Sequence, residues 1–386
     1  MRNGAYVDAT RAVSYICAES CVGEWSPSRG VRRADPRGAD PARTAAMADK
    51  EMTVSDSSEL LAKGIEAVEG DDFDTADRIL DKAGDLLGEN DSGVLHLAGL
   101  LAWARGEFER ACGFLMQATD AEPDRFEIYL DCAECLFVTG DIGDAEAQVR
   151  VALARKGLST EEDGEAKLLL AQIRLADDDP EEALEVLDSI HEELRAHPAW
   201  LSARGSALIE SDRADDAVAL LKSAVAEEPE NPDYHYNLAL ALDVAGDESS
   251  SRESMLNVLR LDAAANDEGA DLTPQESEGL KSIVEELLEE LPGPILELVA
   301  NVPIEVRRRP SEVQVQAGVD PRDLVYFVGK PRKEGSNAKL ERIGLARDIL
   351  LSDVEHEDEV SDAVFAALVE TIQVFFDRED LVMEEV

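Results

Sequence analysis

The sequence predicts a mainly α-helical chain, in which about six helix–turn–helix repeats form a solenoid and a small α+β domain follows. Small residues recur at a nearly constant spacing between Gly64 and Ala239. Aromatic residues make up only 5% of a chain that is 44% hydrophobic, so the core must consist of Leu, Ala, Val and Ile, which suits close helix packing. The spacing stops near Asn266 and strand-like runs follow. A chain of 386 residues has room for two or three domains.

The net charge limits the classes of partner. The chain carries 85 acidic and 37 basic residues, which gives a formal charge of −48. A field of this sign repels phosphates, so it disfavours nucleic acid and anionic membrane surfaces as partners. Most of the carboxylates are expected on a solvated surface. The partner expected from these charges is another protein or a peptide.

The cysteines and the apolar runs indicate the compartment. There are five cysteines, an odd number, with no spacing typical of a disulfide framework. No run approaches 18 apolar residues, which disfavours a transmembrane helix, and the first residues lack the apolar core of a secretion signal. We therefore expect a cytoplasmic protein.

Residues 1–46 differ in composition from the rest. The segment Ser26–Gly38 is rich in Arg, Pro and Gly and has no helical or alternating period, so we predict a disordered tail. The acidic composition begins at Met47. Two interpretations remain open: Met47 is the biological start and the first 46 residues are an over-extended gene assignment, or those residues form a short targeting or interaction tail.

The repeats follow a fixed register. In the first five repeats a small residue in the first helix, here called the anchor, precedes an Ala in the second helix by 12 positions, because the two helices cross closely there; in the sixth repeat Ser251 replaces that Ala. A large aliphatic residue follows four positions after that Ala. The anchors are separated by 35, 34, 38, 34 and 34 residues, and Gly–Asp, Gly–Glu or Asp–Pro pairs mark most of the turns. The six anchors are Gly64, Gly99, Ala133, Ala171, Gly205 and Ala239.

This register resembles the tetratricopeptide repeat family over about residues 57–266. The resemblance implies a right-handed superhelix of helix pairs, with a concave groove lined by the first helix of each repeat. Each repeat contacts only its neighbours in such a solenoid. The resemblance therefore implies a surface for holding a partner.

Eight residues map to the concave face in this register. They form a mixed apolar and aromatic lining that suits an extended peptide or an amphipathic helix. Two interpretations stay open: the residues bind a partner, or several of them pack between helices or beneath the C-terminal domain. Lys and Arg are absent from these positions, which disfavours an acidic chaperone tail as the ligand. The eight are His96, Leu100, Trp103, Leu130, Glu134, Phe137, Ile209 and Tyr236.

One cysteine pair has the spacing of half a zinc site. Cys132 and Cys135 are three residues apart, but the chain has no second pair of this kind, and a structural zinc site needs four ligands. Cys132 also lies where the repeat expects an apolar residue. We predict buried thiols here, with no metal and no cofactor.

Residues 270–386 are predicted to form the α+β domain. A helix begins at Thr273-Pro274 and ends before Pro292-Gly293, and Ile295 to Val299 give a further helical turn. Val302–Val306 and Asp323–Gly329 are predicted strands. Arg342–Asp353, which contains Ile349-Leu350-Leu351, is a candidate third strand, and a last helix runs from about Glu359 to Phe376.

The order of these elements resembles a small bacterial family of zincin-like metallopeptidases over about residues 275–380. The matching segments are Val284–Pro292, Asn301–Val306 and Arg309–Ser311. Members of that family end in a helix that bears the motif HExxH. The resemblance implies a zincin-like fold, and a metallopeptidase that recruits substrates through its repeats is the alternative function.

The zinc-binding motif itself is missing. Two histidines one helical turn apart must face the metal, with a glutamate beside the first as general base. In the best alignment Glu370 matches that base, but Val369 and Gln373 replace the two histidines. His356, in an acidic loop before the helix, is the one histidine of this domain, and a solvated loop is the expected role of that segment. We therefore predict a decayed, non-catalytic domain without zinc.

Two basic segments stand out against the acidic background: Arg307–Arg309 and Lys330–Lys333. They could dock an acidic partner or the chain's own acidic repeats, and the charge of the repeats favours the second. Together these observations predict a non-catalytic scaffold for protein–protein interaction.

Overall fold

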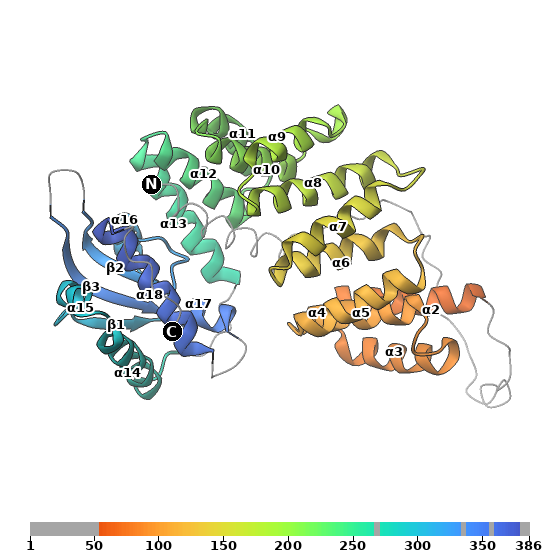
Figure 1. Ribbon diagram of the computed structural model, residues 1–386, viewed down its shortest axis with the longest axis horizontal. Helices are drawn as coiled ribbons and strands as arrows, with labels where there is room; N and C mark the ends of the chain where they lie inside the picture. Colours follow the sequence, from red (N-terminus) through yellow and green to blue (C-terminus); the bar gives the residue numbers. More distant parts are fainter. Residues whose placement is uncertain (1–53, 266–270, 333–336, 355–358, 379–386) are drawn as a thin grey trace, which may run out of the picture. The chain divides into compact units, whose positions relative to one another are not determined.

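The computed structural model describes residues 54–265, 271–332, 337–354 and 359–378. The chain divides into two compact units between Leu194 and Arg195. Figure 1 labels the helices and strands of both units. The predicted tail of residues 1–46 and Met47 lie outside the described residues. Each unit is described by itself below.

The first unit consists of helix–turn–helix pairs. The first helix of each pair contacts the second, and first helices of successive pairs also contact one another: α2 with α4, α4 with α6, and α6 with α8. The pairs are α2 (Val54–Glu69) with α3 (Phe73–Leu87), α4 (Ser92–Ala104) with α5 (Phe108–Ala121), α6 (Phe126–Val138) with α7 (Ile142–Leu153), and α8 (Thr160–Ala176) with α9 (Pro180–Asp188); a 3₁₀ turn, Glu192–Leu194, follows.

Small residues hold each pair together. At the anchor Gly99, an added Cβ would lie 2.7 Å from Leu115 of the second helix, so only glycine permits this approach. The partner Ala111 is completely buried, and Leu115 is 1% exposed. The turns also need a left-handed residue, and Gly106 supplies it with φ of 75°. The register predicted from the sequence is therefore the one that packs the helices.

The second unit begins with two more pairs built in the same way. These are α10 (Pro198–Glu210) with α11 (Ala214–Glu227), and α12 (Pro232–Val244) with α13 (Glu248–Ala265). The anchor Gly205 lies against Leu221, where an added Cβ would be 2.6 Å from the leucine side chain. Asn231 caps α12 by accepting hydrogen bonds from the first backbone N–H groups of the helix.

An α+β region completes the second unit. Its three described strands form one sheet in the order β1-β3-β2, in which β1 is parallel and β2 antiparallel to β3. The elements are α14 (Pro274–Glu290), α15 (Gly293–Val299), β1 (Ile304–Arg307), α16 (Glu312–Gln316), β2 (Val325–Lys330), β3 (Lys339–Ala346), α17 (Arg347–Asp353) and α18 (Val360–Phe376).

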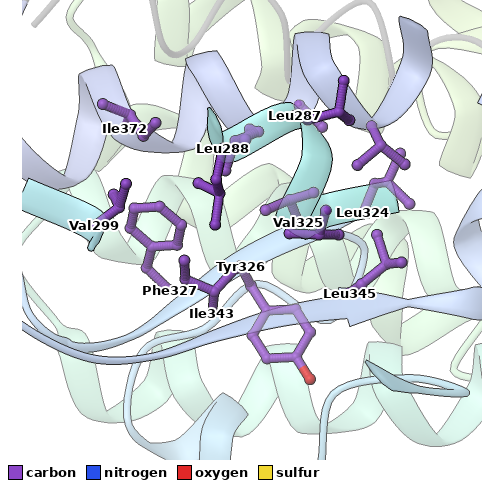
Figure 2. Packing of buried hydrophobic residues seen from close by; sticks show 14 of the residues in the cluster. Leu287, Leu288, Val299, Leu324, Val325, Tyr326, Phe327, Ile343, Leu345 and Ile372 are labelled. Carbon is purple, nitrogen blue, oxygen red and sulfur yellow. The ribbon is translucent and has the colours of Figure 1, made fainter. Parts of the chain in front are cut away.

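The core of this region lies between the sheet and helices α14 and α18, which contact β1 and β2 respectively. Figure 2 shows Phe327 and Leu288 on this side of the sheet, while the Tyr326 ring lies on the other side. Tyr326 covers Gly344 of β3, where an added Cβ would lie 2.1 Å from the ring. Glycine is therefore required for this cross-strand contact.

The prediction of the third strand was wrong in its position. The strand spans Lys339–Ala346, and Ile349-Leu350-Leu351 belong to helix α17. A short apolar run fits a strand or a helix equally well by periodicity, so the sequence could not separate the two. Helix α16 was not predicted at all, since five residues give too few turns for a helical period.

Candidate interaction sites

Six of the eight predicted groove residues lie on α4 and α6 of the first unit. His96, Leu130 and Phe137 are buried, with 4%, 4% and 5% of their surface exposed. Leu100, Trp103 and Glu134 are half-buried on the same two helices. The first three therefore pack between helices, and the latter three remain accessible to a partner. Partner binding at all six stays a prediction.

Trp103 is the large accessible aromatic side chain on α4. Its ring packs edge-to-face on Phe108 with centroids 5.4 Å apart, and it borders the buried core of the first unit. Leu100 lies one turn earlier on the same helix. These two side chains give an apolar strip to the first-helix face, which means the accessible side of α4, α6 and α8, and the Trp103 ring is fixed by the core beneath it.

His96 connects α4 to α6. Its Nε2 lies 2.5 Å from Oδ2 of Asp131, a carboxylate that is 31% exposed. Its Nδ1 is buried and has no hydrogen-bond partner among the described residues. The imidazole therefore fixes Asp131 at the edge of the first-helix face but is itself closed off from solvent.

Carboxylates crowd the neighbouring part of this face. The Glu165 side chain of α8 is exposed. Neighbouring protein atoms nevertheless remove part of the hydration of its carboxyl group, and this raises its pKa. The negative charges of Asp131, Glu162 and Glu127 add to the shift, in that order. Carboxylates of α6 and α8 thus repel one another across the two helices. Sequence reasoning missed this cluster because the groove positions taken from the repeat register did not include Glu127, Asp131 or Glu165.

The other two predicted groove residues, Ile209 of α10 and Tyr236 of α12, lie in the second unit. Ile209 is half-buried, and Tyr236 is 3% exposed. The guanidinium carbon of Arg322, from the loop before β2, lies 5.0 Å from the centre of the Tyr236 ring. Tyr236 is therefore covered by the α+β region, one of the two roles considered from the sequence.

Arg322 joins the α+β region to the last repeat. Its Nη1 donates to Asp233 of α12 at 2.7 Å, while Nε and Nη2 donate to both carboxylate oxygens of Asp262 of α13 at 2.9 and 3.1 Å. All three side chains are less than a tenth exposed. This bidentate geometry is the one that a guanidinium forms best. No sequence signal identified Arg322, because its partners lie 89 and 60 residues away.

The charges in this cluster support one another. Burial alone would lower the pKa of Arg322, but the hydrogen bond to Asp262 and the charges of Asp233 and Asp262 outweigh it, so that the pKa is raised. Burial raises the pKa of Asp233, and Arg322 partly offsets this effect. Burial likewise raises the pKa of Asp320, against opposing hydrogen bonds from the Arg322 backbone and from Tyr236. Arg322 is therefore the cation that opposes the effect of burial on the pKa values of Asp233 and Asp320.

The predicted basic segment Arg307–Arg309 contributes less to this contact. Arg309 lies 3.9 Å from Asp262 of the last repeat, and Arg308 pairs with Asp348 at 3.0 Å. Arg307 pairs with Glu305 of its own strand at 3.5 Å. The expected docking on the chain's own repeats thus holds for Arg309. In the second segment, Lys330 and Arg332 are exposed, and Lys333 lies outside the described residues.

The residues aligned with the zinc motif lie on α18. Val369, Glu370 and Gln373 are half-buried there, and His356 lies outside the described residues. Within the described ranges, no group of three or more His, Cys, Asp or Glu side chains is placed to hold a metal ion. The absence of zinc stays a prediction.

Cys132 and Cys135 are fully buried in the core of the first unit, where Cys112 lies beside them. Burial raises the pKa of Cys132 to about 12, and the pKa of Cys135 is raised by the hydrogen bond with Cys112 and by burial. Thiols in this state are poor nucleophiles and poor metal ligands. The geometry fits the buried thiols that the repeat register predicts.

Among the described residues, no helix is both long and apolar enough to cross a membrane.

Comparison with known proteins identifies the repeats. Residues 96–160, 140–198 and 202–267 match the family model described as tetratricopeptide repeat. A search of curated protein sequences gave no match. Similar solved structures include PilF of Pseudomonas aeruginosa, at 14% identity and TM-score 0.46, covering 53% of this chain and 91% of PilF.

Two further solved structures are similar over about half of the chain. PilW, a type IV pilus biogenesis factor, is 14% identical with TM-score 0.47, and the match covers 53% of this chain and 92% of PilW. YrrB, described as a TPR protein with an unusual peptide-binding site, is 16% identical with TM-score 0.35, covering 47% of this chain and 91% of YrrB.

Proposed function

From the tetratricopeptide repeats of residues 96–267 we propose that this protein is a non-catalytic scaffold that holds a protein or peptide partner against its first helices. The observation that carries the proposal is the set of accessible side chains on α4 and α6. Leu100 and Trp103 of α4 and Glu134 of α6 are half-buried, and Trp103 packs against the core of the first unit. Apolar side chains fixed in this way beside carboxylates suit an extended peptide or an amphipathic helix.

The test compares two half-buried aromatic residues in affinity capture from the native lysate. Trp103→Ala removes an aromatic side chain from a first helix, whereas Phe114→Ala removes one from the second helix α5 that also borders the core. We expect Trp103→Ala to lose the captured partner and Phe114→Ala to keep it, with similar losses of thermal stability. Equal capture by both variants would count against the proposal.

For the α+β region we propose that peptidase activity is absent. The support is chemical: Val369 cannot bind zinc, and the amide of Gln373 is a poor substitute for imidazole. We expect the purified protein to hold no stoichiometric zinc by elemental analysis and to leave a casein substrate intact with added zinc. Tight, equimolar zinc would instead favour the alternative, a metallopeptidase that recruits substrates through its repeats.

The proposal places the scaffold in the cytoplasm. Cys112, Cys132 and Cys135 support this location, since all three are buried as free thiols. Fractionation of the native cells tests it, and recovery in an extracytoplasmic fraction would contradict it.

A further inference from the structure

We propose that the first-helix face of α6 and α8 binds a basic segment of a partner protein and that an arginine of that segment seats among Glu127, Asp131 and Glu165. The inference rests on the proposed scaffold function and names the chemistry of its partner. Its basis is the hydrogen bond that Arg322 donates to Asp233 at the equivalent position of the last repeat.

The last repeat holds an arginine on the carboxylate at the corresponding repeat position. Asp233 lies six residues before the anchor Ala239, near the start of the first helix α12. It accepts a hydrogen bond from Arg322, and Tyr236, three residues before the anchor, lies beneath the same guanidinium. An acidic side chain at this position of a first helix can therefore hold an arginine that arrives from outside the repeat.

Two earlier repeats carry a carboxylate at the same position. Glu127 lies six residues before the anchor Ala133, and Glu165 lies six residues before Ala171. Glu127 is 64% exposed, and its carboxylate lies 4.0 Å from the guanidinium of the nearby Arg125. The pKa of Glu165 is raised by lost hydration and by three other carboxylates, and no cation is among the causes. A guanidinium placed here would relieve the repulsion that this face now carries.

The neighbouring helix α4 fixes one of these carboxylates and also carries an aromatic ring. His96 is 96% buried, since 4% of it is exposed, and it holds Asp131 at 2.5 Å at the border of the cluster, while its own Nδ1 has no hydrogen-bond partner among the described residues. Trp103 of the adjoining helix α4 offers an accessible ring, and aromatic faces attract guanidinium groups. One carboxylate of the cluster, Asp131, is therefore held in a fixed position by His96.

The charges decide between occupants. A second copy of this chain brings another net charge of −48 and is repelled at long range, whereas a basic segment is attracted. Arginine fits better than lysine, because a planar guanidinium bridges two carboxylates, as Arg322 bridges Asp233 and Asp262. The occupant to which the proposal commits is an arginine-bearing segment of another protein.

The test measures binding of three labelled eight-residue peptides to the full chain: alternating Arg–Gly, Lys–Gly and Glu–Gly. The site variant is the double substitution Glu127→Gln and Glu165→Gln. Its matched control, Glu109→Gln with Glu185→Gln, removes the same charge from exposed positions on the second helices α5 and α9. Circular dichroism checks that both double variants remain folded.

We expect Arg–Gly to bind the wild type more tightly than Lys–Gly, and Glu–Gly not to bind. The site variant should weaken Arg–Gly binding by about tenfold, as expected for losing two charge-assisted contacts, while the control stays within about twofold. Equal weakening in both variants, or equal binding of Arg–Gly and Lys–Gly, would overturn the proposal. A peptide of residues 29–43, an Arg-rich part of this chain, serves as a competitor. If it displaces labelled Arg–Gly at a lower concentration than unlabelled Arg–Gly does, the occupant is a segment of this chain, which would also contradict the proposal.

Failure of this inference is separable from failure of the scaffold function. If the partner captured by wild type is lost from Trp103→Ala but kept by the site variant, the scaffold stands and the arginine site is wrong. If Trp103→Ala and Phe114→Ala capture equally while the peptide results hold, the arginine site stands and the proposed use of α4 is wrong.

Discussion

The first helices of the third and fourth repeats differ from the first helix of the sixth in one respect. All three place a carboxylate six residues before the anchor, at Glu127, Glu165 and Asp233. In the sixth repeat Arg322 donates a hydrogen bond to that carboxylate, and Asp233 is 4% exposed. In the third and fourth repeats the carboxylates remain at the surface.

The difference shows how one repeat position serves two purposes. Covered by the α+β region, it becomes a buried ionic contact that joins two parts of one unit. Left uncovered, it becomes part of an acidic face that can receive a cation from elsewhere. The same residue type therefore has opposite consequences. Removing the partner of the buried carboxylate leaves an uncompensated charge and costs stability, whereas removing one of several crowded carboxylates relieves repulsion.

Arg322→Ala should give the largest loss of stability, because it removes the arginine that contacts Asp233 and Asp262. It leaves Asp233 and Asp262 buried without their cation, which costs about 3–5 kcal/mol when one partner of a buried pair is removed. Urea unfolding of the full chain measures the loss. The control Arg307→Ala removes a 45% exposed arginine and should cost less than about 1 kcal/mol. Equal losses in the two variants would show that the buried cluster does not hold the α+β region.

Asp233→Asn should have a smaller effect of the same sign. Arg322 keeps its two hydrogen bonds to Asp262, and the amide oxygen of Asn can still accept one from Nη1. We expect a loss of about 1–3 kcal/mol, which is typical for weakening a hydrogen bond to a charged group. A loss as large as that of Arg322→Ala would mean that Asp262 contributes little.

Gly344→Ala tests whether the sheet of the α+β region is as closely packed as the contact between Gly344 and Tyr326 indicates. The added methyl group would lie 2.1 Å from the Tyr326 ring, so the ring must move, at a cost of about 1–3 kcal/mol. The control Gly279→Ala, on α14 with no atom within 4 Å of an added Cβ, should be neutral or stabilising. Thermal unfolding of both variants measures the difference, and a neutral Gly344→Ala would contradict the packing.

Glu165→Gln should give the smallest effect, with the opposite sign. Because the pKa of folded Glu165 is raised above its ordinary value, the folded chain binds this proton more tightly, and ionisation costs stability as the pH rises through the raised pKa. Removing the charge should therefore raise stability at neutral pH by a few tenths of a kcal/mol, the scale of surface charge effects. Urea unfolding at neutral pH and at pH below the ordinary glutamate pKa checks this. A gain that is larger at the acidic pH would refute it.

Much of the fold was predictable from the sequence. The anchors, the alanines 12 positions later and the large aliphatic residues lie in the packed interface between paired helices. Their regular spacing made them recognisable in the sequence, and the close approach of Leu115 to Gly99 is an example of that packing. The helix from Pro274 and the last helix were also placed correctly. The third strand was not, because its apolar run at Ile349 carries no period of its own.

The interaction sites were less predictable. The repeat register marked Trp103 and Tyr236, but it could not separate an accessible side chain from a covered one. Arg322 escaped because one arginine in a loop has no pattern, and its partners come from a distant helix pair. Glu127 and Glu165 could have been found by comparing polar residues at equal distances from the anchors, the same comparison that links them to Asp233.

Hydrogen-exchange mass spectrometry with the Arg–Gly peptide tests the central claim most directly. We expect the bound peptide to slow exchange in the first turns of α6 and α8, around Glu127 and Glu165, and to leave α12 unchanged, because Arg322 already occupies Asp233. Arg322→Ala should then extend the protection to α12. Protection confined to the second helices, or no extension to α12 in that variant, would contradict the account.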